Sequence, residues 1–258
     1  MLLSPVEFGA CWAALELGDP PLLLELRSPG HTVAERDLLR RRALAGLRER
    51  GLSDGRRPAE PLTSVLRLLA QPDYELDIRL GGGRRGMLLG IGAVAGAHGV
   101  VVLSGDGPLR LLPRDGARVA ATLVGLAGEL SPGVGRPVNI PADLLDEARA
   151  AARDGNLWTL ADELVGRGVS RLDAGSLARM CDGIDTVGQL GATWRPDGLW
   201  RRAPWVVGFH RAAAGHFMQL RRPAGRPGGT ETVTVCPTDA DRLIRQWREL
   251  VEHLLLAA

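Results

Sequence analysis

Lysine is absent from this chain, so all 32 of its strongly basic side chains are arginines. A Walker-type phosphate loop, a Schiff-base lysine and a Ser-Lys catalytic pair each need a lysine, and the sequence excludes all three. Arginine instead of lysine, together with abundant alanine, glycine and proline, is typical of a G+C-rich bacterial genome. This bias by itself carries no functional information.

Cysteines, aromatic residues and long apolar runs are also scarce. The cysteines, Cys11, Cys181 and Cys236, are odd in number and far apart, which favours a reducing compartment over a disulfide framework. No apolar stretch reaches the ~18 residues of a membrane helix, and the first residues lack the pattern of a signal peptide. We therefore expect a cytoplasmic protein that makes no membrane contact.

Excess charge of one sign is missing as well, since the formal net charge is only +2. The runs Arg40-Arg41-Arg42 and Arg56-Arg57 could suggest a phosphate track. The first run, however, lies on an expected helix that also carries Glu35, Asp37 and Glu49, as an ordinary solvated helix face does. We expect no nucleic-acid partner, although an arginine-driven nucleic-acid adaptor remains an alternative.

Helices and strands are clearly punctuated along the chain. Thr32 and Glu35 form a capping-box pattern that begins a helix, and Gly51 ends this helix. Further helices are expected at 6–17, 61–70, 118–130 and 239–256, with two or three more within 141–181. Strands are expected at 22–26, 74–80, 87–97, 98–103, 109–112, 187–194, 199–210, 216–221 and 230–236.

The two runs of strands end in the same way. Pro113, Asp115, Arg118, Leu126 and Leu130 recur 124 positions later as Pro237, Asp239, Arg242, Leu250 and Leu254. Upstream the offset is 118, so that His98 and His216 should occupy equivalent strand positions. We therefore expect an α+β fold: a central antiparallel β-sheet with pseudo-twofold related halves, approximately 1–132 and 133–258, each flanked by helices.

One glycine motif suggests an enzyme. The motif Gly81-x-Gly83-x-x-Gly86 follows an expected strand, and Asp106 lies twenty residues after its last glycine. This spacing is typical of a dinucleotide-binding fingerprint. That fingerprint needs a helix after the last glycine, but 87–99 contains four more glycines, each costing about 1 kcal/mol relative to alanine in a helix. A hairpin loop bearing arginines is the better interpretation, and a dinucleotide-binding enzyme is the alternative.

Other catalytic or metal-binding patterns are lacking. The five histidines include no i,i+4 pair, the cysteines form no C-x-x-C motif, and no G-x-S-x-G elbow occurs. We expect no catalysis, no cofactor and no metal.

Tryptophan and arginine cluster late in the chain. Trp194, Trp200 and Trp205 make up half of the six tryptophans and alternate with arginines that include Arg201 and Arg202. Tryptophan and arginine are enriched at the centres of protein interfaces. Core packing explains the cluster equally well, so both interpretations stay open.

The chain resembles the EspG family of type VII (ESX) secretion systems over nearly its whole length. The motifs are Glu7-Phe8 to Trp12, Leu15-Glu16-Leu17-Gly18, Pro20-Pro21-Leu22, Ser28-x-Gly30-x-Thr32, Glu35-Arg36, Leu47 to Arg50-Gly51-Leu52, Leu66-x-Leu68-Leu69-Ala70 and Cys236-Pro237-Thr238-Asp239-Ala240-Asp241-Arg242-Leu243. Their order and spacing together carry the resemblance.

The resemblance implies a single EspG-like domain over 1–258. It also implies a cytosolic chaperone that binds the helical tip of PE/PPE-like or other helical type VII substrates, keeps them soluble and directs them to secretion. In the family the sheet, the loop after its second strand and the C-terminal helical subdomain hold the substrate. That loop carries over to Leu80 to Met87. We expect Gly82, Gly83, Arg84, Arg85 and Met87 in it, together with the Trp-Arg cluster, to bind the partner. A homo-oligomer is compatible with the sequence.

Overall fold

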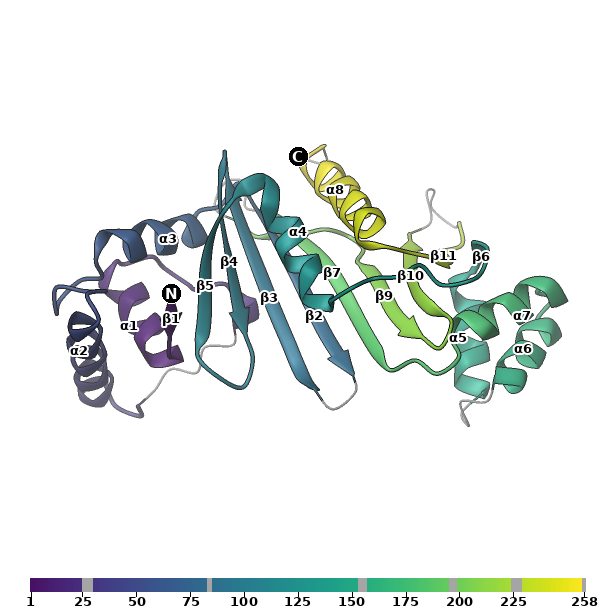
Figure 1. Cartoon of the computed structure of the whole chain (residues 1–258), viewed down its shortest axis with the longest axis horizontal. Helices are drawn as coiled ribbons and strands as arrows, with labels where there is room; N and C mark the ends of the chain where they lie inside the picture. The colour runs from purple at the N-terminus through teal and green to yellow at the C-terminus, as the bar shows by residue number, and fades with distance from the viewer. Residues whose placement is uncertain (25–29, 83–84, 153–156, 195–198, 224–228, 257–258) are drawn as a thin grey trace. The chain divides into compact units, whose positions relative to one another are not determined.

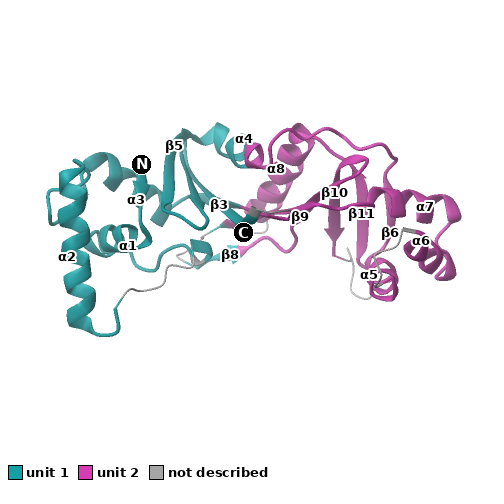
Figure 2. Cartoon of the chain, turned by 60° about the horizontal axis from the view of Figure 1, so that its bottom comes forward, with its two compact units in different colours: residues 1–77, 86–123, 194–201 teal, residues 78–85, 124–193, 202–258 magenta. Residues whose placement is uncertain are grey.

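The computed structural model describes residues 1–24, 30–82, 85–152, 157–194, 199–223 and 229–256 (Figure 1). The chain forms two compact units that are interleaved along the sequence (Figure 2). Unit 1 comprises Met1–Asp77, Gly86–Leu123 and Trp194–Arg201. Unit 2 comprises Ile78–Arg85, Val124–Thr193 and Arg202–Ala258.

Unit 1 combines helices with an antiparallel sheet of order β1-β5-β4-β3. Most or all of each of the following elements belongs to it: β1 (Leu2–Leu3), α1 (Pro5–Ala14), the 3₁₀ helix η1 (Leu22–Leu24), α2 (Val33–Glu49), α3 (Glu60–Ala70), β3 (Arg85–Ala95), β4 (His98–Ser104), β5 (Leu109–Asp115), η2 (Gly116–Arg118) and α4 (Val119–Val124). Strand β2 (Tyr74–Gly82) begins in unit 1 and continues into unit 2.

Unit 2 also combines helices with an antiparallel sheet, whose strand order is β7-β9-β10-β11-β6. Its remaining elements are η3 (Gly125–Ala127), β6 (Val138–Pro141), α5 (Ala142–Ala151), α6 (Leu157–Gly166), α7 (Arg171–Met180), β7 (Thr186–Trp194), β9 (Val207–Ala212), β10 (Gly215–Arg222), β11 (Thr232–Pro237) and α8 (Ala240–Leu256). The short strand β8 (Arg201–Arg202) pairs with β7. Within the described residues, no helix combines the length and apolar character needed to cross a membrane.

The predicted capping box opens α2. The Thr32 hydroxyl accepts a hydrogen bond from the Glu35 backbone N–H at 3.2 Å, and the Glu35 carboxylate accepts one from the Thr32 N–H. These bonds satisfy N–H groups that have no partner inside the helix. A local sequence signal was sufficient here because both partners lie within one turn.

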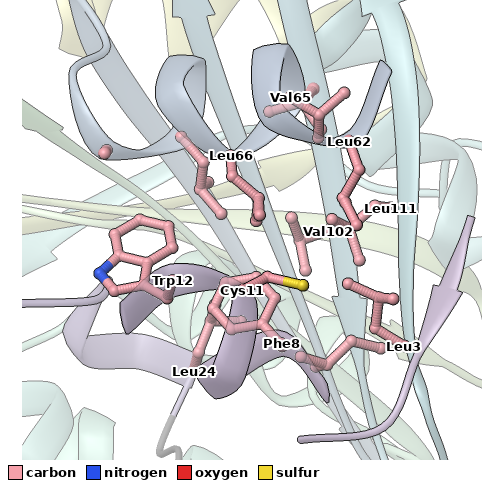
Figure 3. Close-up of a cluster of buried hydrophobic side chains, with 14 of the residues drawn as sticks. Leu3, Phe8, Cys11, Trp12, Leu24, Leu62, Val65, Leu66, Val102 and Leu111 are labelled. Atoms are coloured by element: carbon pink, nitrogen blue, oxygen red, sulfur yellow. The ribbon is translucent and has the colours of Figure 1, made fainter. Parts of the chain in front are cut away.

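The core of unit 1 lies between its helices and one face of its sheet (Figure 3). Ile91, Val102 and Leu111 are successive cross-strand neighbours, and all are fully buried. Phe8 of α1 and Leu66 of α3 are buried in the same cluster. Each large side chain removed from water in this way contributes roughly 1.5–3 kcal/mol.

The other face of this sheet receives α4 at two glycines. A Cβ on Gly92 or Gly99 would lie 2.3 or 2.4 Å from the methyl carbons of Val119. The glycines that argue against a helix after residue 86 therefore have a positive role in a strand, because they let a helix approach the sheet closely.

Both expected strand-Pro-x-Asp-helix units are present. The Asp115 carboxylate accepts a hydrogen bond from the Ala117 N–H at 3.0 Å, and Asp239 accepts one from the Arg242 N–H at 2.7 Å. The first helix is shorter than predicted, since α4 gives way to η3 and the chain turns at Gly128, where φ is 82°.

Two local predictions are wrong. Residues 22–24 form a 3₁₀ helix in place of the start of a strand, while residues 25–26 lie outside the described residues. His98 and His216 are also not equivalent. Pro113 pairs with Val100, and the corresponding Pro237 pairs with Phe217. His98 lies two residues before Val100, and the residue two before Phe217 is Gly215, so His98 corresponds to Gly215 and not to His216. A slip of one position reverses the face of a strand residue, so His98 is exposed while His216 is buried.

Candidate partner-binding site

Part of one sheet face in unit 2 is left uncovered by the described residues. Cross-strand neighbours share a face, and burial falls along each row from β11 or β10 to β7. In one row Phe217 is 0% exposed, His210 2% and Val187 49%. In the next row Val235 is buried, Gln219 and Gly208 are half-buried and Gln189 is exposed. We call Val187, Gln189, Gly208 and Gln219 the uncovered sheet face.

The covered part of this sheet face lies under helices α5, α6 and α7. Helices α5 and α7 pack against β6 and β11, and their apolar side chains share a core with Phe217 and Val235. The last residue of α7, Met180, reaches as far as His210 on β9. Beyond that point the face carries small or polar side chains, apart from Val187.

His210 is the polar group at this boundary. Its Nε2 lies 2.8 Å from the Met180 carbonyl oxygen, and its Nδ1 lies 3.1 Å from Nε2 of Gln219. Burial lowers the pKa of His210, because the charged imidazolium would lose its hydration. The ring also stacks on Phe217, with centroids 5.7 Å apart.

The predicted loop residue Gly82 lies beside the start of β7. It is exposed, its φ is 122°, and a Cβ added to it would lie 2.3 Å from the carbonyl oxygen of Asp185. Only glycine fits such a conformation and such a close approach. Gly82, the last residue of β2, therefore lies next to Asp185 and Thr186, which directly precede Val187 of the uncovered sheet face.

An ion pair fixes the segment that precedes β7. The Arg211 guanidinium donates to both Asp185 carboxylate oxygens, with Nε–Oδ1 at 2.8 Å and Nη2–Oδ2 at 2.6 Å. These hydrogen bonds lower the pKa of Asp185. Both side chains are about half exposed, so the pair orients this segment more than it stabilises the fold.

The other predicted loop residues are placed differently. Met87 on β3 belongs to unit 1 and is 65% exposed. Arg85 begins β3, whereas Gly83 and Arg84 lie outside the described residues. Their role as partner-binding residues stays a prediction.

The Trp-Arg cluster is divided between the two units. Trp194, Trp200 and Arg201 belong to unit 1, with both tryptophans half-buried and Arg201 exposed. Arg202 and Trp205 belong to unit 2.

Each residue of the cluster in unit 2 has a contact within the chain. The ring centroids of Trp205 and of His253 on α8 are 4.5 Å apart, and Arg202 Nη1 lies 3.4 Å from the Thr193 hydroxyl. Packing therefore accounts for part of the cluster, and a binding role for it stays a prediction.

The dinucleotide alternative is wrong, because β3 occupies the position of the required helix. Strand β2 ends at Gly82 and Gly86 already lies in β3, so no helix N-terminus follows the motif to receive a pyrophosphate. Among the described residues, no group of three or more His, Cys, Asp or Glu side chains could hold a metal ion.

Sequence reasoning missed the uncovered sheet face itself. The sequence feature that could have indicated this face is the pair of polar residues, Gln189 and Gln219, on largely apolar strands. It was ambiguous because either face of a strand can be the solvent face until the strand register and the position of the helices are known.

Comparison with known proteins places this geometry in a family. Residues 4–249 match the model of the EspG family. No match was found among curated proteins.

A structure of the Mycobacterium tuberculosis type VII secretion system chaperone EspG5, in complex with the PE25-PPE41 dimer, is similar with a TM-score of 0.77 and 16% identity. The match covers 98% of this chain and 95% of that one. It supports an α+β fold with a large antiparallel sheet flanked by helices. The chain therefore belongs to the EspG family of non-catalytic type VII secretion chaperones.

Proposed function

We propose that this protein binds the helical tip of a PE/PPE-like type VII secretion substrate in the cytoplasm, keeps it soluble and directs it to secretion. Membership of the EspG family is the observation that carries the proposal. EspG5, which shares this fold, forms a complex with the PE25-PPE41 dimer. The uncovered sheet face and the adjoining Gly82 are the described surface best suited to this role.

The physical task is to cover an apolar helical tip and later release it. A partly polar sheet face suits this task, because it offers less apolar area than a permanent interface. Val187, 49% exposed, supplies an apolar contact, while Gln189 and Gln219 supply hydrogen-bonding groups. Exposed arginines such as Arg201 would mainly affect orientation and association rate.

The remaining expectations refine this proposal. A single EspG-like domain with pseudo-twofold related halves, approximately 1–132 and 133–258, is supported by the two meanders that each end in an Asp-capped helix. The predicted loop, Leu80 to Met87, and the cluster from Trp194 to Trp205 would contribute further contacts. A homo-oligomer is one state in which the free chaperone could exist.

Copurification tests the proposal. The chain should copurify with a PE/PPE-like pair encoded in its own genome when the three proteins are coexpressed. Val187→Asp should abolish the complex, because it places a charge against an apolar tip, while leaving the melting temperature nearly unchanged.

Val33→Asp is the matched control, since Val33 is a 66%-exposed valine on α2. It should leave the complex intact. Failure of the wild-type chain to retain any PE/PPE-like or WXG-type protein would overturn the proposal.

A further inference from the structure

His210 has a determined tautomer. Its Nε2 lies 2.8 Å from the Met180 carbonyl oxygen, which can only accept a hydrogen bond, so Nε2 must carry the hydrogen. A neutral imidazole has one N–H group, and its other nitrogen is an acceptor. His210 is 2% exposed, and burial favours its neutral form. Nδ1 is therefore an acceptor.

This tautomer determines how the Gln219 amide is oriented. The group 3.1 Å from Nδ1 must be the amide NH₂, because a carbonyl oxygen there would face another acceptor. Side-chain amides are otherwise ambiguous between two orientations. The carbonyl Oε1 of Gln219 is therefore directed away from His210, and no hydrogen bond to it is made by the described residues.

Gln219 lies at the edge of the buried part of the sheet face. It is half-buried on β10 opposite Gly208, which has no side chain to cover it. Gln189 is in the same row on β7 but is exposed, and no contact with a histidine orients it among the described residues. The two glutamines thus share a face and differ in orientation.

We propose that Gln219 is a specificity-determining residue of the uncovered sheet face and that His210 is its positioning residue. Oε1 of Gln219 accepts a hydrogen bond from a backbone N–H at the helical tip of the substrate. The first N–H groups of a helix have no partner within that helix, so a tip exposes suitable donors. This inference rests on the proposed function for its partner, whereas the side-chain orientation does not depend on it.

Nuclear magnetic resonance of the free wild-type chain tests the orientation alone. The ¹⁵N shifts of His210 should show a protonated Nε2 and an unprotonated Nδ1 at neutral pH. A scalar coupling across the hydrogen bond should connect Nδ1 with Nε2 of Gln219. A protonated Nδ1, or an absent coupling to Gln219, would overturn the positioning role.

Binding variants test recognition, with the PE/PPE-like pair that copurifies with the wild-type chain as the probe. Gln219→Met keeps the length of the side chain but removes the acceptor, and should weaken binding about three- to tenfold. The matched control, Gln71→Met, replaces an exposed glutamine at the end of α3, outside the uncovered sheet face, and should change the affinity less than about twofold. Equal effects of the two substitutions, or no effect of Gln219→Met, would overturn the specificity role.

A double-mutant cycle separates positioning from a general loss of structure. His210→Phe should weaken binding in the wild-type chain but have little further effect in Gln219→Met, because the oriented amide is already gone. Additive losses would contradict the positioning role. If the wild-type chain binds no pair at all, the proposed function fails together with the recognition step, while the spectrum still decides the orientation.

Discussion

The ring of Phe209 lies directly over Gly188 on the neighbouring strand. A Cβ added to Gly188 would be 2.2 Å from Cζ of Phe209, far inside van der Waals contact. Gly188→Ala should therefore lower the free energy of unfolding by about 1–3 kcal/mol through overpacking. Urea denaturation measures this, with Gly46→Ala in α2 as the control. Gly46 has open space around it, so alanine there should be neutral or stabilising.

Gly82 should tolerate alanine poorly. Its φ of 122° is unfavourable for any L side chain, and a Cβ would collide with the Asp185 carbonyl oxygen. We expect Gly82→Ala to cost about 1–3 kcal/mol and to weaken substrate binding by moving the loop. Thermal unfolding and copurification measure the two effects. Gly107→Ala, at a glycine with nothing within 4 Å, should change neither.

Acid should destabilise the fold through His210. Its pKa is lowered by burial, so below the unfolded value of about 6.5 the unfolded chain takes up a proton that the native imidazole resists. Stability from this group is complete above about pH 6.5 and falls by up to about 1.4 kcal/mol per pH unit below it, until the folded pKa is reached.

His210→Gln should flatten this part of the pH profile of unfolding. Arg149 and His216 also disfavour the charged imidazole, so both are kept unchanged. His98→Gln, at an exposed position, is the control and should leave the slope as in the wild-type chain. Equal slopes for wild type and His210→Gln would contradict the assignment.

The thiol of Cys11 should be inert in the folded protein. Burial raises its pKa to about 12, so at pH 8 only about one thiol in ten thousand is the reactive thiolate. Cys236 is buried as well, and its pKa is also raised. In a Cys181→Ala variant, Ellman's reagent should titrate the two remaining thiols rapidly in guanidinium and orders of magnitude more slowly without it. Rapid native reaction would refute the burial of these thiols.

Trp247 should be a critical core residue of unit 2. It is 0% exposed, and its indole N–H donates to the Gly191 carbonyl oxygen at 2.9 Å. Trp247→Phe removes this buried hydrogen bond and leaves a cavity, and should cost about 2–4 kcal/mol. Trp158→Phe, at a tryptophan that is 74% exposed, should cost far less in the same denaturant titration. Similar costs would show that Trp247 is not buried as described.

The sequence predicted features that depend on neighbours along the chain. The Thr32-Glu35 capping box and the helix starts after Asp115 and Asp239 were identified correctly, because each depends on residues within one turn. The two meanders also followed from alternating strands and glycine turns. The resemblance to the EspG family came from many such local motifs in the right order.

Features that depend on distant partners were missed. Strand β1 has two residues and β6 has four, and each exists only because β5 or β11 lies beside it. The two-residue signal at Leu2–Leu3 is too short to indicate a strand. The expected equivalence of His98 and His216 failed for a related reason, since one step of register reversed the face.

By itself, then, the sequence determined the family, the order of most helices and strands and the helix caps of this protein, because local hydrogen bonding and apolar periodicity encode them. Only the tertiary structure decided which sheet face stays uncovered, why Gly188 and Gly82 must be glycine, and how His210 orients Gln219. Those relationships join residues on different strands, and strand pairing together with helix packing brings them within contact distance.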